Sequence, residues 1–143
     1  MKKPELIEII KNTIKNTKEC FEFYNVDGCR VKCPNCQLKI RFDGCANSYF
    51  GVKGGCDCII IFKDKISLVE CKNGKFGSSD AKNSIEQIKK CCNFVKNNGN
   101  DRFIEAVIYH GGGVEYMSMS RVKIELERLH LSVEFYKCGH GLK

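Results

Sequence analysis

Two short apolar runs dominate residues 56–72, which read CDCIIIFKDKISLVECK. The runs Cys58 to Phe62 and Ile66 to Cys71 are rich in β-branched residues and are apolar at both parities. This pattern is typical of central strands that are covered on both faces of a sheet. We therefore expect two neighbouring strands here, joined by a tight turn.

The register of this strand pair brings two carboxylates together. If Lys63-Asp64 is a two-residue turn, Asp57 lies opposite Glu70. Opposed side chains have Cβ atoms about 4.5–5.5 Å apart, and like charges at that distance destabilise a sheet unless they are neutralised. Lys72 projects from the same face as Glu70, because side chains alternate along a strand. An acidic pair beside a lysine suits a hard cation and favours metal-assisted phosphodiester hydrolysis.

The same residues resemble the motif of a known family. Asp57, twelve further residues and then Glu70-Cys71-Lys72 resemble the motif of the PD-(D/E)XK nuclease superfamily, although Cys56 stands where that motif has proline. The run Ser78 to Gln87 resembles the helix that follows the motif, with Gln87 at the place of the supporting glutamine. The resemblance covers about residues 43–109. It implies an α/β, restriction-endonuclease-like fold with a central mixed β-sheet flanked by helices.

The resemblance also implies roles for individual residues. Asp57 and Glu70 would bind one or two Mg²⁺ or Mn²⁺ ions, with the backbone carbonyl of Cys71 as a further ligand. Lys72 would position or activate the attacking water, and Gln87 would support the site. Some members of the superfamily add an acid from the first helix. Either Glu5 or Glu8 fits that role by position, and nothing in the sequence chooses between them.

Two other functions are compatible with these residues. Some branches of the superfamily keep the fold without catalysis, so the chain could be an inactive nucleic-acid-binding protein. Alternatively, it could be a zinc-stabilised interaction module in which the acidic residues are incidental. We expect a nuclease that acts on nucleic acid, with DNA favoured over RNA. Cleavage of both strands of a duplex would favour a homodimer.

Eleven cysteines are unusual for a chain of 143 residues. Because no secretion signal is evident, we expect reduced thiols rather than a disulfide framework. The knuckle Cys33-Pro34-Asn35-Cys36 can place two thiolates on one structural Zn²⁺. It can equally be a turn whose thiols pack as small hydrophobes. Further zinc ligands could come from Cys29, Cys45, Cys138 and His140, whereas core packing is expected for Cys20, Cys71, Cys91 and Cys92.

Length and charge are consistent with one nucleic-acid-binding domain. The chain should form a single domain over residues 1–143, with a cysteine-rich β-hairpin insertion at about 29–45. The net charge is +7, from 24 basic and 17 acidic side chains, which weakly favours a polyanionic partner. The longest clearly apolar run, Cys58 to Phe62, is far shorter than the roughly 20 residues that cross a bilayer. We therefore expect an intracellular protein with no membrane partner.

Periodicity and turn residues predict the remaining elements. Apolar residues spaced by three and four predict a helix from Pro4 to about Lys18 and another from Ser78 to about Val95. The latter should cover one face of the sheet. A strand separated from Glu70-Cys71-Lys72 by this helix should run parallel to it. The expected strands are Cys20–Val26, Cys29–Cys33 paired with Gln37–Phe42, Phe103–Tyr109, Val114–Met119 and Leu131–Cys138, with a short helix at Arg121–Leu129.

Overall fold

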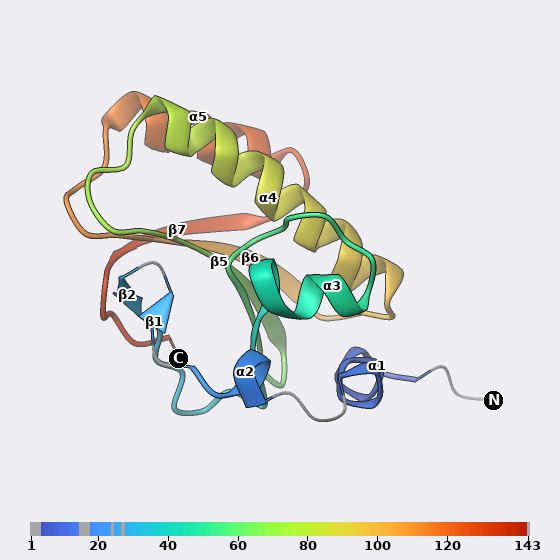
Figure 1. Ribbon diagram of the computed structural model, residues 1–143. Coiled ribbons are helices and arrows are strands. Elements are labelled where there is room, and N and C mark those ends of the chain that lie inside the picture. The colour runs from blue at the N-terminus through green and yellow to red at the C-terminus, as the bar shows by residue number, and fades with distance from the viewer. Residues whose placement is uncertain (1–3, 15–17, 24, 27, 143) are drawn as a thin grey trace.

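A five-stranded mixed β-sheet lies at the centre of the computed structural model, which describes residues 4–14, 18–23, 25–26 and 28–142 (Figure 1). The strands follow the spatial order β3-β4-β5-β6-β7. The β3, β4 and β5 strands are antiparallel to one another, whereas β5, β6 and β7 are parallel. The predicted α/β class and mixed sheet are thus confirmed. The strands are β3 Leu38–Arg41, β4 Cys58–Ile61, β5 Lys65–Lys72, β6 Phe103–His110 and β7 Ser132–Lys137.

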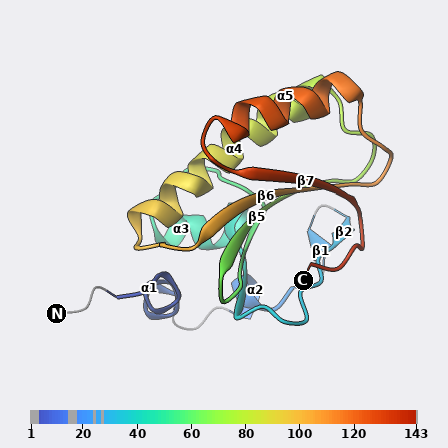
Figure 2. The same cartoon turned by 180° about the vertical axis from the view of Figure 1, so that it is seen from behind.

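Helices cover one face of this sheet, and a small hairpin covers the other. The long helices α4 (Ser78–Asn97) and α5 (Tyr116–Glu127) lie together above β5, β6 and β7 in Figure 1. A two-stranded sheet made of β1 (Asn25–Val26) and β2 (Cys29–Arg30) lies on the opposite side, beside the C-terminal end (Figure 2). The remaining helical elements are α1 Leu6–Thr13, α2 Lys18–Phe21, the π-type turn η1 Phe42–Ala46 and α3 Asn47–Tyr49.

The register between β4 and β5 agrees with the prediction from the Lys63-Asp64 turn. Cys58 pairs with Val69 and Ile61 pairs with Ile66, so the next pair along the ladder is Asp57 with Glu70. The backbone N–H of Phe62 donates to the carbonyl of Lys65 at 2.9 Å and closes the turn. The two carboxylates therefore come from opposed positions on adjacent segments.

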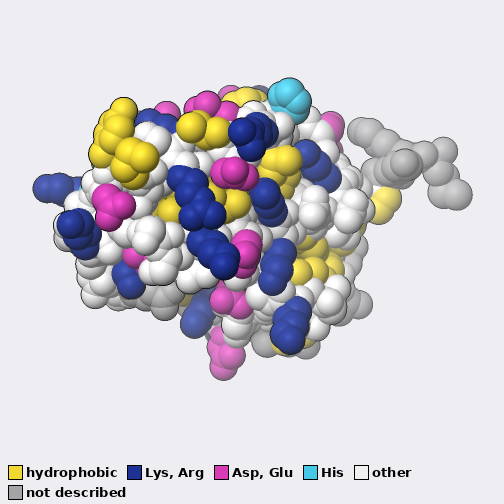
Figure 3. Space-filling model, turned by 90° about the horizontal axis from the view of Figure 1, so that it is seen from above, with side chains coloured by type: hydrophobic (Ala, Val, Ile, Leu, Met, Phe, Trp, Pro, Cys, Tyr) yellow, Lys and Arg dark blue, Asp and Glu magenta, His cyan; other side chains and the backbone are white. Residues whose placement is uncertain are grey.

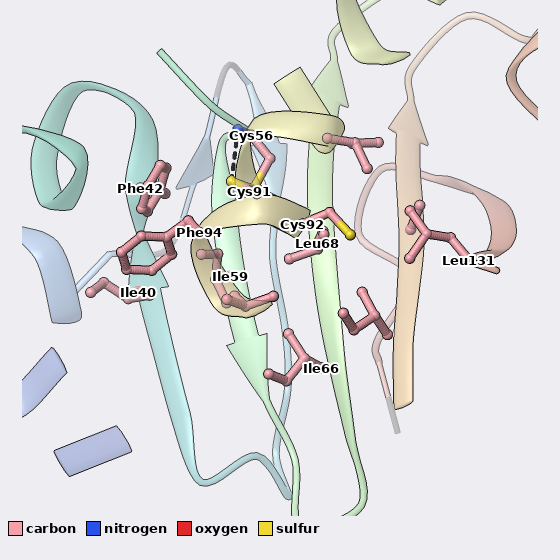
Figure 4. Close-up of a cluster of buried hydrophobic side chains, with 14 of the residues drawn as sticks. Ile40, Phe42, Cys56, Ile59, Ile66, Leu68, Cys91, Cys92, Phe94 and Leu131 are labelled. Carbon is pink, nitrogen blue, oxygen red and sulfur yellow. Dashed lines mark hydrogen bonds between the residues drawn. A yellow bond between two sulfur atoms is a disulfide. The ribbon is translucent and has the colours of Figure 1, made fainter. Parts of the chain in front are cut away.

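Apolar side chains fill both faces of the central strands, as the two-parity pattern predicted. Ile59, Ile66 and Leu68 belong to the core beneath the helices, which also contains Phe42 and Phe94 (Figure 4). Alternate residues, including Ile60 and Val69, belong to a second core on the hairpin side. The Phe42 and Phe94 ring centroids are 4.9 Å apart, and this contact ties the turn after β3 to α4. A charged group on either face of β4 or β5 thus borders an apolar core.

The parallel half of the sheet follows from helix α4. Its buried stripe contains Ala81, Ile85, Ile88, Cys92 and Val95, as the helical spacing predicted. Because α4 crosses over the sheet, β6 returns parallel to β5, with Glu70 paired to Ile108. The predicted parallel strand and the last strand are both confirmed, as β6 and β7.

The predicted Cys20–Val26 strand and the hairpin at about 29–45 are wrong. Residues Lys18–Phe21 form helix α2, and only Asn25–Val26 is a strand. The β2 strand pairs with β1 instead of with the segment after Pro34, while β3 pairs with β4. Pairing with β4 buries Ile40 beneath the helices, whereas a local hairpin could not offer that apolar partner. The local turn residues were therefore outweighed by non-local burial.

The predicted Val114–Met119 strand is also wrong, because α5 begins at Tyr116. Val114 forms a single bridge with Phe76 and no longer strand. Ser118, Val122 and Leu126 are the buried residues of α5. Their spacing of four is helical, and it extends the predicted helix at Arg121–Leu129 by one turn toward the N-terminus.

Eight of the eleven cysteines lie in four pairs with their sulfur atoms at disulfide distance, so the expectation of reduced thiols is wrong for these residues. Cys20 and Cys91 are buried as predicted, but both are also paired. Cys58, Cys71 and Cys92 lie outside these four pairs and are buried. The pairs are Cys20–Cys45, Cys29–Cys138, Cys33–Cys36 and Cys56–Cys91.

This pairing bears directly on the predicted zinc knuckle. Cys33 and Cys36 lie with their sulfur atoms at disulfide distance from each other, and they can serve as thiolate ligands only when reduced, so the zinc knuckle stays a prediction. Among the suggested further ligands, Cys29 is joined to Cys138, and the ring of His140 stacks on Tyr136 at 4.2 Å. Zinc at this knuckle would therefore require prior reduction of the Cys33–Cys36 bond.

Candidate functional site

Asp57 and Glu70 reach across to each other's chain segment. The backbone N–H of Asp57 donates to Glu70 Oε1 at 3.1 Å. In return, the backbone N–H of Cys71 donates to Asp57 Oδ2 at 2.7 Å. Both acidic residues are half-buried. The reciprocal hydrogen bonds bring the two carboxylates together at the end of β5, as the register predicted.

The charge of this pair affects its apolar surroundings. Burial raises the pKa of the Cys58 thiol, and the negative charges of Asp57 and Glu70 raise it further. The positive charge of Lys39 lowers the pKa of Cys58, but its effect is smaller than those of burial and of the two acids. The thiol therefore stays protonated beside the two acids.

Lys72 lies on the same face of β5 as Glu70, but its ammonium group has a partner that the sequence did not predict. Lys72 Nζ lies 3.4 Å from Asp80 Oδ1, and the lysine side chain is 46% exposed. Asp80 Oδ2 also accepts the backbone N–H of Gly77 at 2.9 Å. Asp80 therefore fixes the start of α4 and holds Lys72 there. The signal for Asp80 was its place in the first helical turn, which indicated only helix stabilisation.

Gln87 contacts the loop that precedes Asp57 rather than the carboxylates themselves. Its Oε1 accepts the backbone N–H of Gly55 at 2.6 Å. One helical turn later, Cys91 is paired with Cys56, and its sulfur also accepts the Cys56 N–H at 3.0 Å (Figure 4). Helix α4 therefore holds the loop at two successive residues. The supporting role implied for Gln87 takes the form of positioning the backbone next to Asp57.

Gly55 allows this loop to pack closely against the core. Its φ is +113°, and a Cβ at this position would lie 2.5 Å from the ring of Phe42. We expect Gly55→Ala to lower the free energy of unfolding by about 3 kcal/mol, because it adds both backbone strain and a clash. Urea denaturation followed by circular dichroism measures this change.

Gly51→Ala is the matched control for Gly55→Ala. Gly51 also has a positive φ, +68°, but a Cβ there would meet no atom within 4 Å. Gly51→Ala should therefore lower the free energy of unfolding only through backbone strain, by about 1–2 kcal/mol. Equal losses in the two variants would show that the contact with Phe42 does not constrain the loop.

The first helix lies at the far end of α4 from Lys72. Glu5 and Glu8 are exposed. The carbonyl of Pro4 lies 3.1 Å from the position that a Cβ on Gly99 would take, just beyond the end of α4. Asp80, the partner of Lys72, lies in the first turn of the same 20-residue helix. A helix of this length spans about 30 Å, so the start of α1 is remote from Lys72.

A histidine and a second lysine lie in line with Lys72 and were not predicted as site residues. Lys72 pairs with His110 on β6, and His110 pairs with Lys137 on β7. His110 is buried, and its Nδ1 accepts the backbone N–H of Gly113 at 3.1 Å. Burial lowers the pKa of His110, and the charge of Lys137 lowers it further. This row depends on the pairing of three strands, which local sequence does not show.

The donor set at Asp57 and Glu70 fits a hard cation. Magnesium commonly takes one or two protein carboxylates and keeps several waters. A carboxylate offers about four lone-pair positions, so accepting one N–H is compatible with metal ligation. Within the described part of the chain, no group of three or more His, Cys, Asp or Glu side chains could hold a metal ion. An ion here would therefore use the two carboxylates, water and backbone oxygen such as the Cys71 carbonyl.

Comparison with known proteins leaves the family of this chain open. None of the helices in the described residues is both long enough and apolar enough to cross a membrane. No protein-family model, curated protein or solved structure matches the chain.

Proposed function

We propose that this protein is a metal-dependent nuclease of the restriction-endonuclease-like fold that hydrolyses phosphodiester bonds, with DNA as the favoured substrate. The observation that carries the proposal is the reciprocal hydrogen bonding of Asp57 and Glu70 between adjacent segments. The position of Lys72 on the same face adds the group that a phosphate substrate needs.

Asp57 and Glu70 would hold Mg²⁺ or Mn²⁺, together with the backbone carbonyl of Cys71. When bound, such an ion polarises a phosphoryl oxygen and lowers the pKa of a bound water. The two acids keep their positions because each accepts a backbone N–H from the other's segment. Gln87 and Cys91 hold the preceding loop, so Asp57 does not have to be ordered when substrate binds.

Lys72 would stabilise the negative charge that develops on the phosphate. In the structure, its ammonium group rests on Asp80, and the half-exposed side chain can turn toward a bound phosphate. Exchange of the Asp80 carboxylate for a phosphate oxygen keeps the ammonium group paired with an anion. Asp80 is therefore a positioning residue that keeps Lys72 at the site between turnovers.

Lys72→Met tests this proposal. With purified protein and Mg²⁺, we expect cleavage of labelled DNA that stops in chelator and returns when Mg²⁺ is added back. Lys72→Met should lower the cleavage rate by about a hundredfold, since one positioned cationic group is lost. Lys63→Met is the matched control, because Lys63 is exposed in the turn at the other end of β5. Chelator-resistant cleavage, or equal rates for the two variants, would overturn the proposed chemistry.

A second candidate function is nucleic-acid binding without catalysis on the same fold. The ion pair between Lys72 and Asp80 favours it, because the ammonium group rests on a carboxylate of the protein itself. Salt-sensitive DNA binding without cleavage at any Mg²⁺ or Mn²⁺ concentration would select this function. A zinc-stabilised interaction module would need Cys33 and Cys36 as thiolates, and therefore a reduced Cys33–Cys36 pair.

A further inference from the structure

We infer that the surface at the carboxyl ends of β5, β6 and β7 binds unpaired bases, so that the substrate is single-stranded DNA or DNA with a single-stranded segment. We call this the strand-end surface; it consists of Lys72, Tyr116, Met117 and Lys137. The inference rests on the proposed nuclease function, since it names the substrate class for the same site.

Two loops hold the strand-end surface in place. Residues 73–77 follow β5, and residues 111–115 follow β6. Gly111 N–H donates to the Lys72 carbonyl at 3.0 Å, and Gly112 N–H donates to the Gly74 carbonyl at 2.8 Å. Phe76 joins the two loops by two further hydrogen bonds. Its N–H donates to the Gly113 carbonyl at 2.9 Å, and its own carbonyl accepts the Glu115 N–H at 3.0 Å. The residue that follows Glu115 is therefore held in a defined position relative to the end of β5.

Two large apolar side chains project from this anchored turn into solvent. Tyr116 is 76% exposed and Met117 is 71% exposed, and they are the first two residues of α5. An exposed aromatic ring on an ordered backbone offers a flat face at low entropic cost. Nucleobases stack on such rings with little dependence on sequence, but only when they are not already stacked in a duplex. Tyr116 therefore favours an unpaired base.

The two lysines in this row supply the phosphate contacts that such a strand needs. Lys72, His110 and Lys137 occupy paired positions on three adjacent parallel strands, so they share one face of the sheet. Both lysines are exposed. A strand that stacks a base on Tyr116 can place its phosphates on these two lysines, and Lys72 leads toward Asp57 and Glu70. The arrangement combines an aromatic platform with a basic track, as single-strand binding requires.

The outer face of α4 and α5 is less suited to hold a nucleic acid. Figure 3 looks onto this helical layer, and its many lysine and arginine side chains are interspersed with acidic ones. Lys89 Nζ, for example, lies 3.9 Å from Glu125 Oε2, and Glu125 also contacts Arg128 at 3.5 Å. The positive charge of this face is thus partly neutralised within the protein. The strand-end surface is the better match for a polyanion.

Fluorescence anisotropy with the full chain tests the inference. The probes are a labelled single-stranded oligonucleotide and a duplex that contains the same strand, both without Mg²⁺. Tyr116→Ala should weaken binding of the single strand by about 5- to 100-fold and binding of the duplex by less than about twofold. Tyr116→Phe should bind like the native protein, because the ring rather than the hydroxyl stacks.

Phe103→Ala is the matched control. Phe103 is also exposed, at 56%, but it begins β6 at the opposite end of the strand. It should leave both affinities unchanged. Single-strand affinity that survives Tyr116→Ala, equal losses for the two probes, or no single-strand binding by the native protein would each overturn the inference.

Cleavage in Mg²⁺, measured separately, distinguishes this inference from the proposed function. Cleavage that depends on Asp57 but not on Tyr116 would contradict the role of the strand-end surface and support the nuclease function. Single-strand binding that depends on Tyr116, with no cleavage by the native protein, would contradict the nuclease function and support the role of the strand-end surface.

Discussion

Asp57→Asn should abolish most of the Mg²⁺-dependent cleavage while the fold is retained. The asparagine oxygen can still accept the Cys71 N–H that Asp57 accepts at 2.7 Å, so the local backbone contact survives. The change removes the negative charge that a metal ion needs. We expect a loss of about 4 kcal/mol of transition-state stabilisation, roughly a thousandfold in rate. Initial cleavage rates at saturating Mg²⁺ measure the effect.

The control for this variant is Asp64→Asn. Asp64 is exposed in the turn between β4 and β5, so the same loss of charge occurs away from the two acids. Its cleavage rate should equal that of the native protein. Retention of more than about a third of the native rate by Asp57→Asn, with unchanged circular dichroism, would mean that the acidic pair is not the metal centre.

The double variant Cys29→Ala with Cys138→Ala should show the largest loss of stability among the cysteine variants. The bond between these residues closes a loop with a sequence separation of 109 and ties the β1–β2 hairpin to the C-terminal segment. In the chain-entropy model, a loop of this length is worth about 4–5 kcal/mol. Urea denaturation of the oxidised proteins measures the difference, and a reducing agent should lower the stability of the native protein toward that of the variant.

Removal of the Cys33–Cys36 bond gives the comparison. These residues are only three apart, so the entropy model assigns their bond about 2 kcal/mol. If the Cys33→Ala, Cys36→Ala protein were less stable than the double variant at Cys29 and Cys138, loop entropy would not explain the result. If the reduced native protein binds zinc and the Cys33→Ala, Cys36→Ala protein does not, the reduced knuckle holds the metal.

The β4–β5 pair was predicted correctly because its signals are local. The Lys63-Asp64 turn sets the register, and apolar residues at both parities allow only a strand that is covered on both faces. Asp57 therefore had to lie opposite Glu70. The alternation of side chains along β5 likewise placed Lys72 on the face of Glu70.

The errors fall where a local pattern competed with distant partners. Residues 29–45 contain the turn residues of a hairpin, but β3 gains more by burying Ile40 against the helices through its pairing with β4. Val114 to Met119 was predicted as a strand, but a helix that begins at Tyr116 buries Val122 and Leu126 together. Burial of apolar surface decided both cases.

The sequence by itself determined the central strand pair, the helix that crosses to β6 and the meeting of two carboxylates, since each depends on residues that are close along the chain. Only the tertiary structure decided that Lys72 rests on Asp80 and that Gln87 holds Gly55. The same is true of the row of Lys72, His110 and Lys137. These contacts join separate elements, and their geometry is set by how the whole core packs. Periodicity along one segment carries no information about that packing.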